Sequence, residues 1–188
     1  FTRELELGAS VAVDGVCLTV TRIDEGPESD LEIVRFDVME ESLRVSNLRA
    51  LTEGQLVNVE RSYRGGEVGG HPISGHVDAT ATVVEAIPTA NNMNITFSVA
   101  PQWIRFIFLK GFIALNGASL TVSDIDKARC RFSVWLIPET LRKTNLSALT
   151  VGSLVNMEIE RSTQVIVETL ERLVPQLTSG SSVESIVS

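Results

Sequence analysis

Two side chains that can act as nucleophiles, Cys17 and Ser119, occupy the same place in two similar stretches of the sequence. The stretch VDGVCLTV at 13–20 carries the thiol, and LNGASLTV at 115–122 carries the hydroxyl. A thiol or hydroxyl beside a proton acceptor can attack an electrophilic carbon or pass on a proton. However, a small polar residue after a hairpin can simply fit the strand, and a free cysteine is often a small buried side chain. A binding role and a structural role therefore stay open at both positions.

One histidine and one carboxylate add proton-transfer chemistry. His76 follows Gly75 at the expected start of a strand, and an imidazole can exchange protons near neutral pH. Alternatively, His76 has a structural role and makes one backbone hydrogen bond. Glu160 has no counterpart in the first stretch, because Ser62 stands at that place. A carboxylate that occurs in only one of the two stretches fits a pair of sites with different chemical roles.

Other polar residues are expected to serve the fold. Glu60 and Glu158 stand at equivalent positions, and a carboxylate that both stretches keep is expected to anchor a turn or a similar feature. We assign His71 a structural role as well.

The similar stretches belong to a duplication that runs through the chain. Gly15 and Gly117 are 102 residues apart (117 minus 15), which is too long for the period of a solenoid. Two more pairs of segments follow in the same order: ESLRVSNL at 41–48 with ETLRKTNL at 139–146, and GQLVNVER at 54–61 with GSLVNMEI at 152–159. Shared order over three blocks indicates two copies, each a small domain with its own core.

Within each copy the signals are those of short β-strands. In the first copy, β-branched and partly alternating runs occur at 10–13, 18–21, 34–38 and 56–59. Asp14-Gly15 and Asn116-Gly117, each between apolar runs, are typical of tight hairpin turns that need positive φ. Short strands at this spacing predict a barrel in each copy.

Three further segments are expected to connect these strands or to follow them. One or two helical turns are expected at 41–48 and 139–146, whereas periodicity cannot decide between a strand and a short helix at 102–110. After the second copy, Ser162 or Thr163 can cap a helix. Its apolar face holds Val167, Leu170, Val174 and Leu177. This face either packs on its own barrel or forms a seam between subunits, and its near-heptad spacing at the end of the chain favours the seam.

The two copies differ in what precedes the hairpin turn. In the second copy a strand candidate at 74–84 begins 43 residues before Gly117 (117 minus 74), whereas 14 residues precede Gly15. The comparison predicts that the first barrel lacks its first strand, which leaves two unpaired strand edges.

Composition excludes several classes of protein. The net charge of −8 and the pI near 4.8 oppose the basic surface that nucleic-acid binding needs. Cys17 and Cys130 lie far apart, and their spacing suggests neither a disulfide framework nor a zinc site. We therefore expect the protein in the reducing cytoplasm. No run of about 18 apolar residues is present, and charged residues at 1–7 are unlike a signal peptide.

Several motifs in the right order resemble the riboflavin synthase family. They are GVCLTV at 15–20, GGH at 69–71, SGHVD at 74–78, KGFIALNGASLTV at 110–122 and IPETL at 137–141. The resemblance covers residues 7–175 or so and is specific because the motifs are separate.

The resemblance implies an all-β fold of two tandem six-stranded Greek-key β-barrels followed by a C-terminal α-helix. In this chain the first barrel is expected to lack its N-terminal strand. The implied domains are a first lumazine-binding barrel at 1–70, a second at 71–161, an oligomerisation helix at 162–177 and a flexible tail at 178–188.

The resemblance also implies the reaction. Two molecules of 6,7-dimethyl-8-ribityllumazine react, one donating a four-carbon unit to the other, to give riboflavin and 5-amino-6-(ribitylamino)uracil without a metal or organic cofactor. The working site in that family pairs the N-terminal barrel of one subunit with the C-terminal barrel of another in a cytoplasmic homotrimer. Association with lumazine synthase is a further implied partner. Such chemistry requires two heterocycles held face to face in a water-poor space, with a base for the 7-methyl group and a nucleophile or water for the acceptor.

The family's functional positions carry over residue by residue. In the first barrel the implied binding residues are Cys17, Leu18, Thr19, Asp37, Val38, Met39, Glu40, Glu41 and Ser42. In the second they are Gly75, His76, Val77, Ser119, Leu120, Thr121, Trp135, Leu136, Ile137, Pro138, Glu139 and Thr140. Lys110 is expected to reach across from a neighbouring subunit. The candidates for acid, base or nucleophile are Ser10, Cys17, His76, Ser119 and Glu160.

A lumazine or flavin carrier without catalysis is the alternative function. Carriers that share the duplicated barrel keep one binding site and let the other decay. Both GxxLTV blocks and both Glu-[Ser/Thr]-Leu-Arg blocks are intact here, which favours the enzyme.

Overall fold

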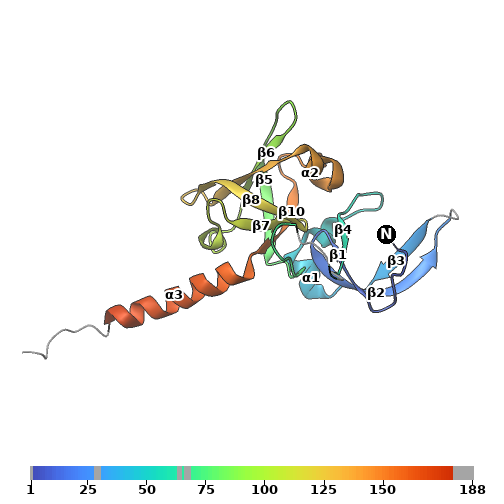
Figure 1. The fold of residues 1–188 in the computed structure, drawn as a ribbon, viewed down its shortest axis with the longest axis horizontal. Helices are drawn as coiled ribbons and strands as arrows, with labels where there is room; N and C mark the ends of the chain where they lie inside the picture. Colours follow the sequence, from blue (N-terminus) through green and yellow to red (C-terminus); the bar gives the residue numbers. More distant parts are fainter. Residues whose placement is uncertain (1, 28–30, 63–64, 66–68, 180–188) are drawn as a thin grey trace, which may run out of the picture.

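The second copy forms a closed β-barrel. The computed structural model describes residues 2–27, 31–62, 65 and 69–179. Six strands close in the order β10-β5-β6-β9-β8-β7, all antiparallel (Figure 1). Their bounds are β5 Ala79–Pro88, β6 Met93–Ser98, β7 Phe112–Leu115, β8 Ala118–Asp126, β9 Arg131–Leu136 and β10 Leu154–Ile159. The barrel predicted for this copy is confirmed.

The first copy forms an open sheet of four strands in the order β3-β2-β1-β4. The strands are β1 Ser10–Val13, β2 Val16–Glu25, β3 Glu32–Phe36 and β4 Val59–Arg61. They repeat β7, β8, β9 and β10. Among the described residues the first copy has no counterpart of β5 or β6. It is therefore two strands short of the second copy, one more than the sequence comparison predicts.

Short helices connect the strands at equivalent places in the two copies. The first copy has α1 Glu40–Val45 and the 3₁₀ helix η1 Asn47–Ala50, and the second has α2 Pro138–Lys143 and η3 Asn145–Ala148. The helical turns predicted at 41–48 and 139–146 are thus confirmed. The ambiguous segment at 102–110 contains the short helix η2 Ile104–Phe106, whose two apolar ends are buried in the barrel.

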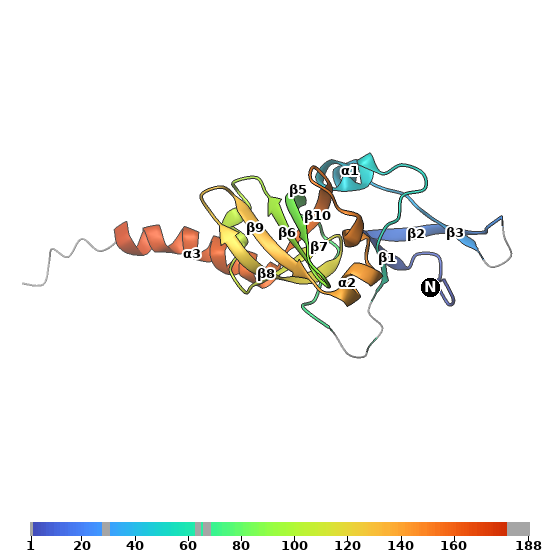
Figure 2. The same cartoon turned by 90° about the horizontal axis from the view of Figure 1, so that it is seen from above.

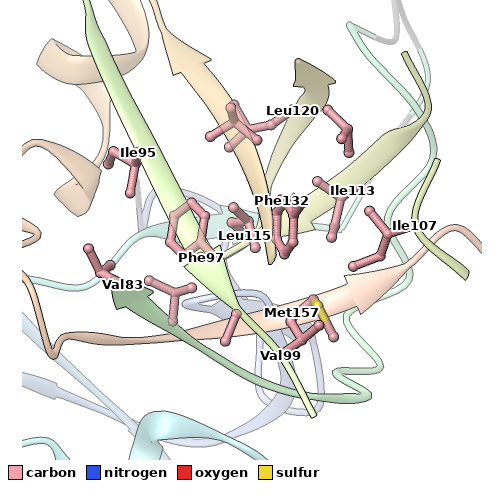
Figure 3. Packing of buried hydrophobic residues seen from close by; sticks show 14 of the residues in the cluster. Val83, Ile95, Phe97, Val99, Ile107, Ile113, Leu115, Leu120, Phe132 and Met157 are labelled. Carbon is pink, nitrogen blue, oxygen red and sulfur yellow. The ribbon is translucent and has the colours of Figure 1, made fainter. Parts of the chain in front are cut away.

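The two cores differ in size as the two sheets do. The barrel encloses nineteen buried apolar residues around the stacked rings of Phe97 and Phe132, whose centroids are 5.4 Å apart (Figure 3). The open sheet buries six: Leu5, Val11, Val13, Val16, Leu18 and Val20. Burial of apolar area is the main favourable term in folding, so the barrel is the more stable scaffold.

The copies meet at their two hairpin turns. Gly15 and Gly117 both have φ of +79°, and a Cβ atom on Gly15 would lie 2.6 Å from the backbone nitrogen of Gly117. Only glycine fits such an approach.

Asparagine side chains join the copies around these turns. Asn58 donates from Nδ2 to the Asn116 carbonyl and accepts the Asn145 N–H at Oδ1, at 2.9 and 2.7 Å. Asn156, the equivalent residue of the second copy, donates to the Asp14 carbonyl at 2.9 Å and accepts the N–H of Asn47 at 2.6 Å. The hydrogen bonds of Asn58 and Asn156 thus relate the two copies by a nearly two-fold symmetry.

Helix α3, Arg161–Ser179, extends away from the barrel on the side opposite the open sheet (Figures 1 and 2). It begins one residue before the predicted helix, and its side chains are described up to Pro175. Val167 packs on the barrel core, and Glu171 pairs with Arg105 at 3.0 Å. Its other apolar side chains are exposed, namely Val165, Ile166, Leu170, Leu173 and Val174. Over the described part of the chain, no helix is long and apolar enough to span a membrane.

Candidate functional site

In each copy a pair of antiparallel strands separates at one end. The pairing of β8 with β9 stops at Val122 and Val134, and the pairing of β2 with β3 stops at Val20 and Phe36. The predicted binding residues on these strands and directly after them lie beyond these last pairs. We call residues 17–19 with 37–42 the first open end, and residues 119–121 with 135–140 the second open end.

Alternation along the strands decides which of these side chains can reach a ligand. Leu18, Leu120 and Leu136 are buried in the cores, with exposed fractions of 7, 8 and 1%. At these three predicted binding positions the backbone, rather than the buried side chain, is therefore available to a ligand. The residues between and beside them point outward: Cys17, Thr19, Met39, Thr121, Trp135 and Ile137 are exposed. Apolar side chains among them offer a surface for a flat heterocycle.

Ser119 at the second open end contacts a histidine that the sequence analysis treated as structural. His71 Nδ1 lies 2.6 Å from Ser119 Oγ, and the backbone N–H of His71 donates to the same oxygen at 3.1 Å. The imidazole is buried and stacked on Phe112, with centroids 5.1 Å apart. Because the N–H already donates to Oγ, the hydroxyl proton can point to Nδ1. His71 and Ser119 thus form a hydroxyl–imidazole pair.

Burial sets the protonation state of this imidazole. Loss of solvent lowers the pKa of His71 below its usual value of 6.5, although the charges of Glu158 and Glu160 oppose the shift. His71 is therefore neutral at pH 7 and can accept a proton. Gly70 allows the contact between His71 and Ser119. It has φ of +84°, and a Cβ atom there would lie 2.7 Å from Ser119 Cβ. Glycine before the histidine lets the chain approach the strand.

Cys17 at the first open end has a different neighbour. Its N–H donates to the Gly75 carbonyl at 2.8 Å, and a Cβ on Gly75 would lie 2.6 Å from Cys17 Cβ. Val77 packs against the core of the first copy. The sequence analysis placed 75–77 at the second barrel's site, and the structure corrects this: the segment that links the copies lies against the first open end.

Glu158 anchors the turn in this linking segment. Its carboxylate accepts the N–H and hydroxyl of Ser74 at 2.8 Å each and the Gly75 N–H at 2.9 Å. The predicted structural role of Glu158 is confirmed, whereas Glu60 is exposed on β4. His76 follows the turn with its N–H on Ser74 Oγ at 3.3 Å and its side chain exposed.

Glu160 caps helix α3, which the sequence analysis assigned to Ser162 or Thr163. Its carboxylate accepts the backbone N–H groups of Ser162 and Thr163 at 3.0 and 2.7 Å and the Thr163 hydroxyl at 2.7 Å. Desolvation raises the pKa of Glu160, but these hydrogen bonds outweigh it and lower the pKa to about 2. A carboxylate with so low a pKa is a weak base at neutral pH.

Ser10 and Lys110 lie beside the open ends rather than in them. Ser10 pairs with Thr19 across β1 and β2, and its carbonyl accepts the Ser62 hydroxyl at 3.0 Å. Lys110 is exposed, and its backbone is in the left-handed region with φ of +65°. Its N–H donates to Val122, the last paired residue of β8 before the second open end, at 2.9 Å.

Acidic residues on the short helices pair with arginines. Glu41 pairs with Arg44 at 2.6 Å, and this partner lowers the pKa of Glu41. The same type of pair joins Glu139 to Arg142 in the second copy. In the first copy Glu40 pairs with Arg49. These ion pairs are exposed and contribute little stability.

Metal ligands do not gather at either open end. Both cysteines are free, and among the described residues no three His, Cys, Asp or Glu side chains are placed to hold a metal ion. A large hollow of about 1020 Å³ lies between the copies beside β4, and none of the predicted catalytic residues lines it.

Comparisons with known proteins agree on one family. The model of the lumazine binding domain matches twice, at residues 2–62 and 74–160. The riboflavin synthase of Escherichia coli (strain K12) is 46% identical over 171 residues, which cover 90% of this chain and 76% of that protein. The riboflavin synthase of Buchnera aphidicola subsp. Baizongia pistaciae is 38% identical over 91% of this chain and 78% of that protein. The chain belongs to the riboflavin synthase family. It is a transferase that catalyses riboflavin formation.

Solved structures related to this riboflavin synthase family chain include a ligand-binding protein. The crystal structure of LumP complexed with 6,7-dimethyl-8-(1'-D-ribityl)lumazine has a TM-score of 0.73 and 25% identity, covering 84% of this chain and 81% of that one. LumP complexed with riboflavin has a TM-score of 0.75 at the same identity and covers 82% of that chain. The curated enzymes are closer in sequence, so the enzyme interpretation holds over the carrier interpretation.

Proposed function

We propose that the chain converts two molecules of 6,7-dimethyl-8-ribityllumazine into riboflavin and 5-amino-6-(ribitylamino)uracil. The observation that carries the proposal is a pair of open ends at equivalent places with unlike reactive groups. The second presents Ser119 beside the neutral imidazole of His71, and the first presents the exposed thiol of Cys17 beside Gly75. One site for a donor and one for an acceptor is what a reaction between two identical substrates needs.

The unlike groups suit the two halves of the reaction. At the second open end, Ser119 and His71 can take a proton from the acidic 7-methyl group of one substrate. At the first, the thiol of Cys17 or a water molecule can add to the ring of the other substrate. The atoms of two substrate molecules equal those of the two products, so the exchange needs no outside oxidant. Positioning is the protein's main contribution.

The remaining predicted residues are proposed as ligand contacts. Those with outward side chains at the first open end are Thr19, Asp37, Met39, Glu40 and Glu41, with Val38 and Ser42 half-buried beside them. At the second they are Thr121, Trp135, Ile137, Pro138 and Glu139, with Thr140 half-buried. Ser10, His76 and Lys110 flank these positions, and Glu160 supports the second site as the cap of α3 rather than as a base.

Assembly and location are part of the proposal. The exposed apolar face of α3 supports a homotrimer in which the open ends of neighbouring chains face one another and Lys110 reaches across. Two free cysteines support a reducing compartment, the cytoplasm. Association with lumazine synthase, which would supply the substrate, is tested by co-sedimentation of the two purified proteins.

Two substitutions test the function at the two open ends. Cys17→Ala and Ser119→Ala are each expected to lower the rate of riboflavin formation at least ~10-fold, because each removes a group from one half of the reaction. Circular dichroism should stay unchanged. Cys130→Ser is the matched control, because Cys130 lies at the far end of the β8–β9 pair. Full activity in both test variants would remove these roles.

A carrier that only binds lumazine is the second candidate, favoured by the likeness to LumP. It predicts tight binding of the lumazine by the wild-type chain with no formation of riboflavin.

A further inference from the structure

Glu158 is a buried carboxylate on the outer side of the second barrel. Alternation along β10 places Met157 and Ile159 in the barrel core and Glu158 on the opposite side of the strand. Its exposed fraction is nevertheless 6%, because the segment that links the copies covers it. Burial of a charge is costly unless hydrogen bonds compensate it, and three donors from Ser74 and Gly75 do so here.

The first copy carries the same carboxylate at the same place in its sheet. Glu158 pairs with Ala114 across β10 and β7, and Glu60 pairs with Ala12 across β4 and β1. Glu60 is exposed, whereas the linking segment, residues 69–78, covers Glu158. The strand itself therefore does not require a buried carboxylate at this position. What distinguishes Glu158 is the segment that it holds.

Strand β10 fixes the linking segment at two successive points. At the first, Glu158 accepts the N–H and the hydroxyl of Ser74 at 2.8 Å each. At the second, the Asp78 N–H donates to the Met157 carbonyl at 2.9 Å, and the Asp78 carboxylate accepts the Ile159 N–H at 2.8 Å. The segment is therefore held along β10 until it enters β5.

The same segment contacts both open ends. Before the anchored turn, His71 Nδ1 lies 2.6 Å from Ser119 Oγ at the second open end. Within the turn, the Gly75 carbonyl accepts the Cys17 N–H at 2.8 Å at the first open end. Gly75 has φ of +80°, and a Cβ atom on it would lie 2.6 Å from Cys17 Cβ, so the approach is close. His71 and Gly75 are four residues apart (75 minus 71), so a shift of the turn moves both contacts.

We propose that Glu158 is a positioning residue for the reaction. Through the linking segment it sets the His71–Ser119 pair at one open end and the backbone beside Cys17 at the other. This inference rests on the proposed function, which gives these groups their roles. Glu158 acts through Ser74 and Gly75. A displacement of about 1 Å in a reacting group can cost ~100-fold in rate, so a carboxylate outside both open ends can control the rate.

The charge of Glu158 distinguishes this role from a merely structural one. The charges of Glu158 and Glu160 raise the pKa of His71, against the larger lowering by burial. Without the charge of Glu158, the pKa of His71 falls further below 6.5. The acidic decline of activity that His71 causes then moves to lower pH. A loss of stability alone would lower the rate without moving this decline.

Amide hydrogen exchange tests the positioning without relying on activity. Glu158→Gln keeps the size of the side chain but replaces one acceptor oxygen by a donor that faces backbone N–H groups. The amides of His71 and Cys17 should each exchange at least ~10-fold faster in the variant. The amide of Val83, which donates to a barrel carbonyl in the middle of β5, should not change. Glu60→Gln is the matched control and should leave all three rates unchanged.

Kinetics of the same variants tests the consequence for the reaction. Glu158→Gln should lower the rate of riboflavin formation at least ~10-fold at pH 7 and move the acidic decline to lower pH. Glu60→Gln should change the rate less than ~2-fold.

A gentler variant guards against misfolding of Glu158→Gln. Ser74→Ala, at an exposed position, removes one of the three hydrogen bonds and keeps the charge of Glu158. It should speed the exchange of the His71 and Cys17 amides without moving the acidic decline.

The pattern of exchange decides the outcome. Faster exchange at His71 alone or at Cys17 alone would overturn the proposal, because the two open ends would then have separate anchors. Equal acceleration at Val83 would also overturn it, because the variant would then be destabilised as a whole. An inactive wild-type chain that shows the expected exchange pattern contradicts the proposed function. An active wild-type chain whose variants exchange like it contradicts only the positioning role.

Discussion

His71 and Ser119 are 48 residues apart in the sequence, yet their side chains meet at 2.6 Å. The hydroxyl was predicted as a functional group because it takes the place of Cys17 in the duplicated pattern. The imidazole was not, since nothing in the local sequence shows that residues 70–71 cross to β8. The pair gives the second open end a buried imidazole, which has no counterpart among the described residues of the first open end.

A histidine substitution tests this pair. His71→Gln keeps a hydrogen-bonding side chain but cannot take up a proton, so the rate should fall ~10-fold or more. Burial lowers the pKa of His71, so the imidazole of the wild-type protein becomes protonated only below pH 6.5, and activity should decline there. The acidic decline should disappear in the variant. A pH profile that His71→Gln leaves unchanged would contradict the role.

The repeat aligned residues that the structure places at equivalent positions of the two copies. Duplication placed Cys17 with Ser119 and identified Glu158 as structural. The repeat did not predict that Glu160 caps a helix, because a cap depends on where the helix begins. It did not predict the position of 75–77 either, because the path of a linking segment depends on the tertiary structure. Alternation along β2, β8 and β9 decides that Leu18, Leu120 and Leu136 are core residues.

At the scale of elements, the hairpin turns define how the copies join. Asp14 and Asn116 are equivalent turn residues, both buried, in the network of asparagine side chains. Burial raises the pKa of Asp14, against hydrogen bonds from Asn58, Asn145 and Asn47. A carboxyl group whose pKa is raised by folding destabilises the fold above that pKa. The cost vanishes as the pH falls below its ordinary value of 3.8.

Replacing the carboxylate by an amide should remove this cost. Asp14→Asn keeps the acceptor oxygen for Asn58 and Asn145, so the free energy of unfolding at pH 7 should rise by about 1 kcal/mol. The gain should shrink as the pH falls toward 3.8. Urea unfolding from pH 4 to pH 8 measures this gain. The matched variant is Asn116→Asp, which should lower the free energy of unfolding at pH 7. A gain that is the same at every pH, or a loss at pH 7, would refute the linkage.

Hairpin and strand signals predicted most elements, and one count was wrong. The extra residues at the start of the second copy hold two strands, β5 and β6, joined by a short turn. Length alone could not distinguish one long strand from a hairpin. The segment 102–110 stayed ambiguous because its apolar residues fill a barrel end from a loop rather than along a periodic face.

The whole molecule is a closed barrel between an open sheet and a projecting helix (Figure 2). Neither the sheet edges at β3 and β4 nor the apolar face of α3 is covered by the described part of the chain. Exposed apolar faces of this kind mark contact surfaces.

Removal of the helix tests assembly. Deletion of residues 162–188 should convert the proposed trimer to monomers, because the deletion removes the exposed face of Val165, Ile166, Leu170, Leu173 and Val174. Sedimentation velocity of the two forms at equal concentration is the measurement. A helix that packs only on its own barrel would leave the number of chains per particle unchanged.

We propose that one duplicated chain brings two identical substrates together and exchanges four carbons between them. Its most direct test is anaerobic incubation of the purified chain with 6,7-dimethyl-8-ribityllumazine alone, followed by chromatographic separation of the products. Riboflavin and 5-amino-6-(ribitylamino)uracil should form in equal amounts, with two lumazines consumed for each riboflavin. Bound lumazine without riboflavin, or riboflavin without an equal amount of the pyrimidinedione, would contradict the account.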